Sequence, residues 1–105
     1  MTDKTAHIDF RTEKRMPLAC SVYIHGITKN EEQVKINSVT ENISLGGLFL
    51  RTPQVLKLGS SIFTLTQLIS GAKLATRGSV IRIEQNKHQL PGLAIRINHH
   101  KFISA

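Results

Sequence analysis

The sequence predicts an all-β fold, a small six-stranded antiparallel β-barrel with a flexible N-terminal arm. Three observations lead to this prediction. Short runs alternate apolar and polar side chains with a period of two, which is the pattern of half-buried strands. Turn-forming residues separate these runs at regular spacing, and no stretch has the periodicity of a long helix.

The predicted strands follow one another along most of the chain. They are rich in β-branched and apolar residues, and the last strand alternates clearly, with Leu93, Ile95 and Ile97 on one face. Segments such as "GITKNEE" and "NKHQLPG" supply the turns between them. The predicted strands cover residues 18–25, 32–43, 47–52, 61–68, 73–85 and 92–98.

The length of the chain is sufficient for one domain with a modest core. We expect a flexible N-terminal segment over residues 1–10, a barrel domain over residues 11–98, and a C-terminal tail over residues 99–105 with at most one helical turn. The N-terminal residues do not resemble a signal peptide, and no window approaches the roughly 18 apolar residues of a membrane span. A cytoplasmic protein without membrane insertion is therefore expected.

The composition is strongly basic. Lys and Arg total 14 against 7 Asp and Glu, which gives a formal net charge of +7. An excess this large in a small domain favours an anionic partner, such as a nucleotide, a nucleic acid or an acidic surface. A solvated basic surface that serves solubility is the plainer alternative. Cys20 is the single cysteine of the sequence, which excludes an internal disulfide, and we expect it in the core.

No pattern of residues predicts catalysis, a metal site or a cofactor. His99 and His100 are adjacent and point in different directions, so they do not form a metal-binding pair. Ser44 lacks the Gly-x-Ser-x-Gly elbow of a hydrolase, and Glu41 and Glu84 have no spacing that would pair them as acid and base. We therefore do not expect an enzyme.

Two short motifs carry the functional information. Arg11 and Arg15 form an R-x-x-x-R pair, and Pro17 disfavours a helix through the residue before it, so we expect the pair on a loop that leads into the barrel. The second motif is "NISLGG", residues 42–47, where a strand carries an amide, a hydroxyl and two adjacent glycines.

The segment "NISLGG" allows two interpretations. In the structural one, Ser44 caps a turn while Gly46 and Gly47 supply unusual backbone dihedral angles at a bulge. In the functional one, a planar ligand lies against the strand, because small hydrogen-bonding residues let it approach the backbone there. The combination of this segment with the arginine pair favours the functional interpretation.

In this order, the two motifs resemble those of the PilZ family, the bacterial receptor domains for cyclic di-GMP. That family carries RxxxR in an N-terminal loop and (D/N)xSxxG on an early strand, which Arg11 and Arg15 and then Asn42, Ser44 and Gly47 match here. The later segments "TRGSVIRI" and "PGLAIRI" are also similar to strands of the family. The resemblance implies a PilZ-like barrel, cyclic di-GMP as the ligand, and a downstream protein partner in motility, biofilm formation or exopolysaccharide secretion.

The chemistry of such a ligand agrees with these residues. Guanidinium groups suit phosphate oxygens and the O6/N7 edge of guanine, so Arg11 and Arg15 can wrap the ligand from one side. Asn42 and Ser44 can hydrogen-bond to guanine, and the two glycines leave space for it. We expect ligand binding to order the N-terminal arm and a partner protein to detect the change.

The sequence departs from the family at two positions. Asn42 replaces the Asp of many relatives, which weakens a hydrogen bond to guanine by about 1 kcal/mol. Phe10 stands where many relatives have an arginine that is associated with a stacked pair of ligands, so we expect one ligand per domain. The remaining arginines are expected to be strand residues with solvated heads, one of which could reach the ligand: Arg51, Arg77, Arg82 and Arg96.

Two other functions remain possible from the sequence. A PilZ-like domain that has lost ligand binding would act as a protein adaptor. A small basic barrel that binds single-stranded nucleic acid would fit the charge. However, the chain has four Phe, one Tyr and no Trp, mostly at apolar strand positions, whereas a stacking platform needs exposed aromatic side chains. Nucleic acid is therefore not an expected partner.

Overall fold

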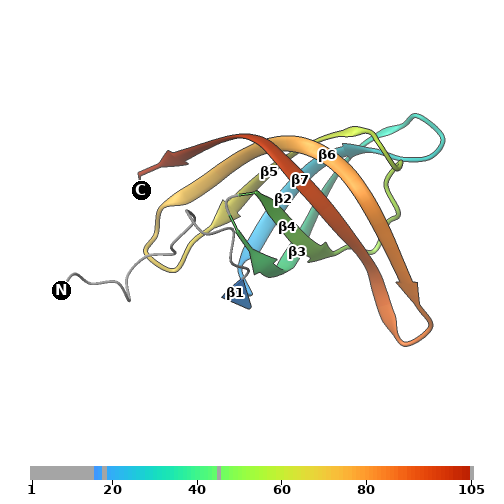
Figure 1. Ribbon diagram of the computed structural model, residues 1–105, viewed down its shortest axis with the longest axis horizontal. Helices are drawn as coiled ribbons and strands as arrows, with labels where there is room; N and C mark the ends of the chain where they lie inside the picture. Colours follow the sequence, from blue (N-terminus) through green and yellow to red (C-terminus); the bar gives the residue numbers. More distant parts are fainter. Residues whose placement is uncertain (1–15, 18, 45, 105) are drawn as a thin grey trace.

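The computed structural model describes residues 16–17, 19–44 and 46–104, and the regular elements in these residues are β-strands that wind into a barrel (Figure 1). The segment before Met16, including Arg11 and Arg15, lies outside the described residues. Within the described part, no helix is long and apolar enough to cross a bilayer. The strands are β1 (Met16–Pro17), β2 (Ser21–Ile27), β3 (Gln33–Ile43), β4 (Gly47–Arg51), β5 (Ser61–Gln67), β6 (Lys73–Asn86) and β7 (Gln89–Ile103).

The strands pair in the order β1-β3-β2-β5-β6-β7-β4, and all pairs are antiparallel. An additional pairing of β3 with β4 closes the sheet on itself. β1 and β2 follow one another along the same edge of β3, since Pro17 is opposite Asn42 and Ser21 is opposite Val39. The described strands therefore form a closed six-stranded antiparallel barrel, which confirms the predicted fold class.

The core lies inside the barrel, where alternate residues of each strand meet. Val22 and Ile24 on β2 are opposite Thr66 and Thr64 on β5, and all four side chains are buried. The hydroxyl of Thr64 shares a hydrogen bond with the hydroxyl of Thr76 on β6. The buried apolar core consists of Cys20, Val22, Ile24, Ile36, Ile43, Leu48, Leu50, Leu56, Ile62, Leu74, Val80, Leu93 and Ile95.

The longest strands, β6 and β7, form a hairpin that projects beyond the rest of the barrel (Figure 1). Its turn is tight, because Asn86 is opposite Gln89. The segment "NKHQLPG", predicted as a turn, therefore belongs largely to β7, which begins at Gln89. The predicted alternation of Leu93, Ile95 and Ile97 is confirmed, since the first two are buried and the third packs against the core.

The predicted C-terminal tail is wrong over most of its length. β7 continues to Ile103, which is opposite Lys73 at the start of β6. Arg77 is opposite His99, whereas Gly78 is opposite Ile97. Asn98 is therefore an extra residue of β7, and it interrupts the alternation of buried and exposed residues at this point. This bulge, followed by two histidines, hides the second half of the strand from a pattern search based on period two.

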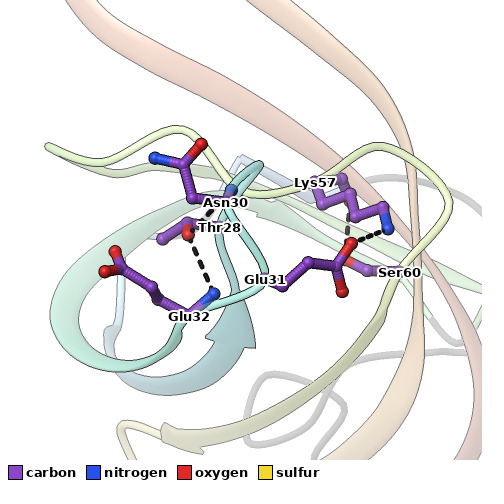
Figure 2. A network of polar contacts seen from close by, with 6 residues as sticks. All are labelled: Thr28, Asn30, Glu31, Glu32, Lys57 and Ser60. Carbon is purple, nitrogen blue, oxygen red and sulfur yellow. Dashed lines mark hydrogen bonds and ion pairs between the residues drawn. The ribbon is translucent and has the colours of Figure 1, made fainter.

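Polar contacts hold the β2–β3 turn against the loop between β4 and β5 (Figure 2). The Thr28 hydroxyl accepts hydrogen bonds from the backbone N–H groups of Asn30 and Glu32, at 3.3 and 3.2 Å. Glu31 adopts a positive φ of 66°, and its carboxylate forms an ion pair with Lys57. These contacts fix two loops that are far apart in the sequence.

Cys20 tests the packing of the core. The residue is 5% exposed, as predicted, and burial raises the pKa of its thiol, while a hydrogen bond with Thr40 lowers it in part. Because the thiolate is the reactive form, we expect Cys20 to react at least about 100-fold more slowly in the folded protein than in denaturant at the same pH. A colorimetric disulfide reagent measures both rates. Equal rates would show that the thiol is accessible and the core is open at this point.

Candidate ligand-binding site

The motif residues Ser44 and Gly47 build the tight turn between β3 and β4. The Ser44 N–H donates to the Gly47 carbonyl at 2.9 Å, and the Gly47 N–H lies 3.1 Å from the Ser44 hydroxyl oxygen. The Ser44 hydroxyl in turn donates to the Gly47 carbonyl at 3.3 Å, and the whole residue is 4% exposed. Ser44 therefore caps this turn, in agreement with the structural interpretation of the motif.

The two glycines let this turn lie against β7. A Cβ atom on Gly47 would lie 2.9 Å from the carbonyl oxygen of Ile95, and this oxygen belongs to a paired strand that cannot move aside. The carbonyl of Gly46 accepts a hydrogen bond from the N–H of Ile97 at 3.0 Å. Gly47 thus has a packing role in addition to any role toward a ligand, whereas the contact of Gly46 uses only its backbone.

A bulge in β3 determines the position of the motif residue Asn42. The register between β3 and β4 shifts between Thr40 and Asn42, so Glu41 is the extra residue. Asn42 is half-buried, and it lies opposite Phe49 on β4, which in turn lies opposite Ala94 on β7. Phe49 and Ala94 face away from the core, because Leu48, Leu50, Leu93 and Ile95 beside them fill the barrel interior.

β1 connects the arginine motif to this site. Met16 and Pro17 pair with Ile43 and Asn42, so the chain enters the barrel beside the second motif. The structure therefore brings Asn42, Ser44, Gly46 and Gly47 together at one end of β3 and β4. Arg11 and Arg15, the other two predicted site residues, lie outside the described residues, although Arg15 is joined directly to Met16.

Charged groups next to the site are partly neutralised. Arg51 on β4 donates to the Glu41 carboxylate at 3.0 and 3.5 Å and to the Leu90 carbonyl at 3.2 Å. Its guanidinium also lies 5.1 Å from the centre of the Phe49 ring. Arg51 is thus a half-buried structural residue rather than one with a solvated head, and Glu41 is not a free carboxylate.

Arg96 is a residue that the sequence did not single out for the site. It is directly opposite Gly47 on β7, and its side chain is exposed. Among the described residues, the ion pairs involve Arg51, Lys57 and Arg82, and none involves Arg96. The pairing of Gly47 with Arg96 depends on barrel closure, and no local pattern in one sequence reveals it.

Comparison with known proteins identifies the family. The family model of the PilZ domain matches residues 9–101. The chain belongs to the PilZ family. The solved structure titled "Structure of Bacillus subtilis Inhibitor of motility (MotI/DgrA)" has a similar fold, with a TM-score of 0.64 and 20% sequence identity. The similarity covers 87% of this chain but 42% of that one, so the PilZ domain spans less than half of the neighbour's length. The comparison with curated proteins found no match.

Membership of the PilZ family confirms the resemblance that was inferred from the arginine and NxSxxG motifs. PilZ domains are generally non-catalytic receptor or adaptor domains of cyclic di-GMP signalling. Within residues 16–17, 19–44 and 46–104, the structure has no group of three or more His, Cys, Asp or Glu side chains that could hold a metal ion.

Gly47→Ala separates the packing role of this PilZ motif from a ligand role. The added Cβ would meet the Ile95 carbonyl, so we expect the ligand-free protein to lose about 1–3 kcal/mol of unfolding free energy. Urea unfolding followed by circular dichroism measures the loss, with exposed Ser61→Ala as the control. If Gly47→Ala unfolds like the wild type, the glycine is not required by β7.

Proposed function

We propose that this PilZ domain is a non-catalytic receptor that binds cyclic di-GMP and signals to a partner protein. The observation that carries the proposal is the pairing of Met16 and Pro17 with Ile43 and Asn42. Because Arg15 is joined to Met16, the RxxxR segment leads directly into the end of β3 that holds the NxSxxG residues. The pairing supports a common site for both motifs.

In the proposed complex, the ligand lies on the outer surface of the barrel at the β3–β4 turn. Asn42 accepts hydrogen bonds from guanine N–H groups through its side-chain oxygen. The Ser44 hydroxyl has one lone pair beyond its contacts with Gly47, and this lone pair can accept another hydrogen bond. Gly46 is half-buried and has no side chain, so a planar base can lie against its backbone, while Gly47 holds the turn against β7.

The arginine segment supplies the charge and the signal. Arg11 and Arg15 contact the phosphates and guanine edges, and ligand binding fixes the segment between them. Fixing five residues costs about 5–10 kcal/mol of backbone entropy, which is comparable with the roughly 8 kcal/mol of a micromolar complex. Charge-assisted contacts from both arginines offset that cost. The partner protein detects the fixed segment.

A ligand-free adaptor is the second candidate, and one observation favours it. The Ser44 hydroxyl and the space beside Gly47 already serve the β3–β4 turn, so the motif could be kept for folding alone. Calorimetric titration with cyclic di-GMP, with GTP as the control, separates the two candidates. A dissociation constant near 1 μM for cyclic di-GMP supports the receptor, and no heat at about 1 mM supports the adaptor.

Arg11→Ala and Arg15→Ala test the arginine segment. We expect each change to abolish binding with a dissociation constant near 1 μM, because each removes a fork of charge-assisted hydrogen bonds. The thermal midpoint of the ligand-free protein should hardly change. Calorimetry measures the first effect and a thermal melt the second. Binding that survives both changes would remove this segment from the mechanism.

Arg96→Ala tests an additional contact. Arg96 is opposite Gly47 on the neighbouring strand, and its exposed side chain has no carboxylate partner among the described ion pairs, so it is available to a ligand phosphate. We expect an affinity about tenfold lower, and a smaller loss for Arg96→Lys, because a point charge is sufficient for a phosphate contact.

The matched control for Arg96→Ala is Lys35→Ala, which removes the same charge from β3. Lys35 lies seven residues before Asn42, at about 20 Å along the strand, and it is also exposed. Calorimetry should show less than about a twofold change for this variant. An equal loss in both variants would assign the effect of Arg96 to net charge rather than to contact.

A further inference from the structure

The outer surface of β2, β5 and the start of β6 carries apolar and aromatic side chains. In each strand the alternate residues fill the core, so the residues between them face outward. Two rows cross the three strands, each made of directly opposite residues. We call this surface the basic outer face, defined by Tyr23, Leu65 and Ala75 in one row and by His25, Phe63 and Arg77 in the other.

This surface corrects an expectation about the aromatic residues. Apolar strand positions suggested that the aromatic side chains would be in the core. Instead Thr64 and Thr66 face inward from β5, and Phe63 and Leu65 lie outside with partial exposure. Tyr23 on β2 is likewise partly exposed. Large apolar side chains that gather partly exposed on one face of a small domain make that face a candidate interaction surface.

The charges around the basic outer face have one sign. Lys35 is opposite His25 on β3, Lys101 is opposite Ala75 on β7, and Lys73 lies at the start of β6. β2 and β5 contain no Asp or Glu, and neither do residues 33–39, 73–79 and 96–103. This surface therefore attracts an anionic partner and repels a second copy of itself.

Two hollows lie on either side of the rows, so the surface is not flat. One, of about 300 Å³, is lined by His25, Phe63 and Arg77 among others. The second, of about 520 Å³, is lined by Tyr23, Leu65, Val39 and Lys73 among others. Hollows of this size between half-buried rings can receive single apolar side chains of a partner.

The basic outer face is on the far side of the barrel from the candidate ligand site. In the closed order β3-β2-β5-β6-β7-β4, three strand steps separate β5 from β4 in either direction. The ligand residues lie at the β3–β4 turn, whereas the face is centred on β5. A partner centred on β5 therefore lies away from Gly47, and its edge reaches toward Asn42 only at the second hollow, through Val39 on β3.

We propose that the basic outer face docks an acidic segment of a partner protein, one that carries apolar side chains between its carboxylates. Lys35, Lys73, Arg77 and Lys101 bind the carboxylates, and the two hollows receive the apolar side chains. The proposal adds the chemistry of the partner to the proposed function. Docking itself needs no cyclic di-GMP and stands independently of ligand binding.

The composition of the face favours a protein over nucleic acid or lipid. Leu65 is at the centre of one row and Ala75 at its end, and Val39 and Ile27 line the two hollows beside the aromatic residues. Aliphatic side chains give no stacking surface to bases, whereas they do contact aliphatic and aromatic side chains of a protein. The flat surface of a lipid bilayer cannot fill the two hollows of the face, whereas side chains of a protein can.

An NMR titration of the ¹⁵N-labelled, ligand-free protein tests the proposal. The probe is a short synthetic peptide that alternates aspartate or glutamate with leucine and phenylalanine. We expect it to bind with a dissociation constant below about 1 mM and to shift the amide signals of β2 and β5. Leu65→Glu and Arg77→Glu should each weaken binding at least about tenfold, because they lie in the face.

Matched controls come from the projecting hairpin of β6 and β7. Leu90→Glu and Lys87→Glu make the same kinds of change at exposed positions outside the face and should leave binding unchanged. Thermal melts confirm that all four variants fold. The proposal is overturned if the peptide leaves β2 and β5 unshifted, or if the hairpin variants weaken binding equally. It is also overturned if an oligothymidylate or vesicles of phosphatidylglycerol bind the face more tightly than the peptide.

Discussion

The close contact of the Ser44–Gly47 turn with β7 is the interaction on which the structure depends. β4 must pair with β3 on one side and with β7 on the other, and this double pairing turns an open sheet into a closed barrel. The turn starts β4 at the correct register through reciprocal hydrogen bonds between Ser44 and Gly47. A side chain at Gly47 would push β4 away from the Ile95 carbonyl, and the barrel edges would lose their partners.

The same turn explains why the motif allowed two interpretations. Ser44 is 4% exposed and Gly47 is buried, so these two residues serve the packed side of the turn. Asn42 and Gly46 are half-buried, so they are the motif residues that a ligand on the outer surface would reach first. Asn42 lies directly after the bulge at Glu41, which places it opposite Phe49 on β4.

The local sequence pattern predicted the strands and their buried faces only where apolar and polar residues alternate without interruption. Leu93 and Ile95 were placed correctly because period-two burial is a local property of a strand. In β5 the alternation set Ile62, Thr64 and Thr66 against Phe63 and Leu65, and the pairing of Thr66 with buried Val22 shows that the first set is inside. The end of β7 was missed because a bulge shifts the alternation after Ile97. For the site, the NxSxxG residues were local in sequence, whereas the neighbourhood of Arg96 arises from barrel closure.

The positions of the two surfaces constrain how signalling could work. The ligand site and the basic outer face share no residues, and closed ladders of antiparallel strands lie between them. A ligand can change the affinity of a partner only through different contacts in two states, and a well-packed barrel offers few such states. Docking on β5 is then expected to be constitutive. Cyclic di-GMP would change the surface of the docked domain at β1 and β3. It would not change whether the domain docks. Under the proposed function, the arginine segment, and not the barrel, would carry the switch.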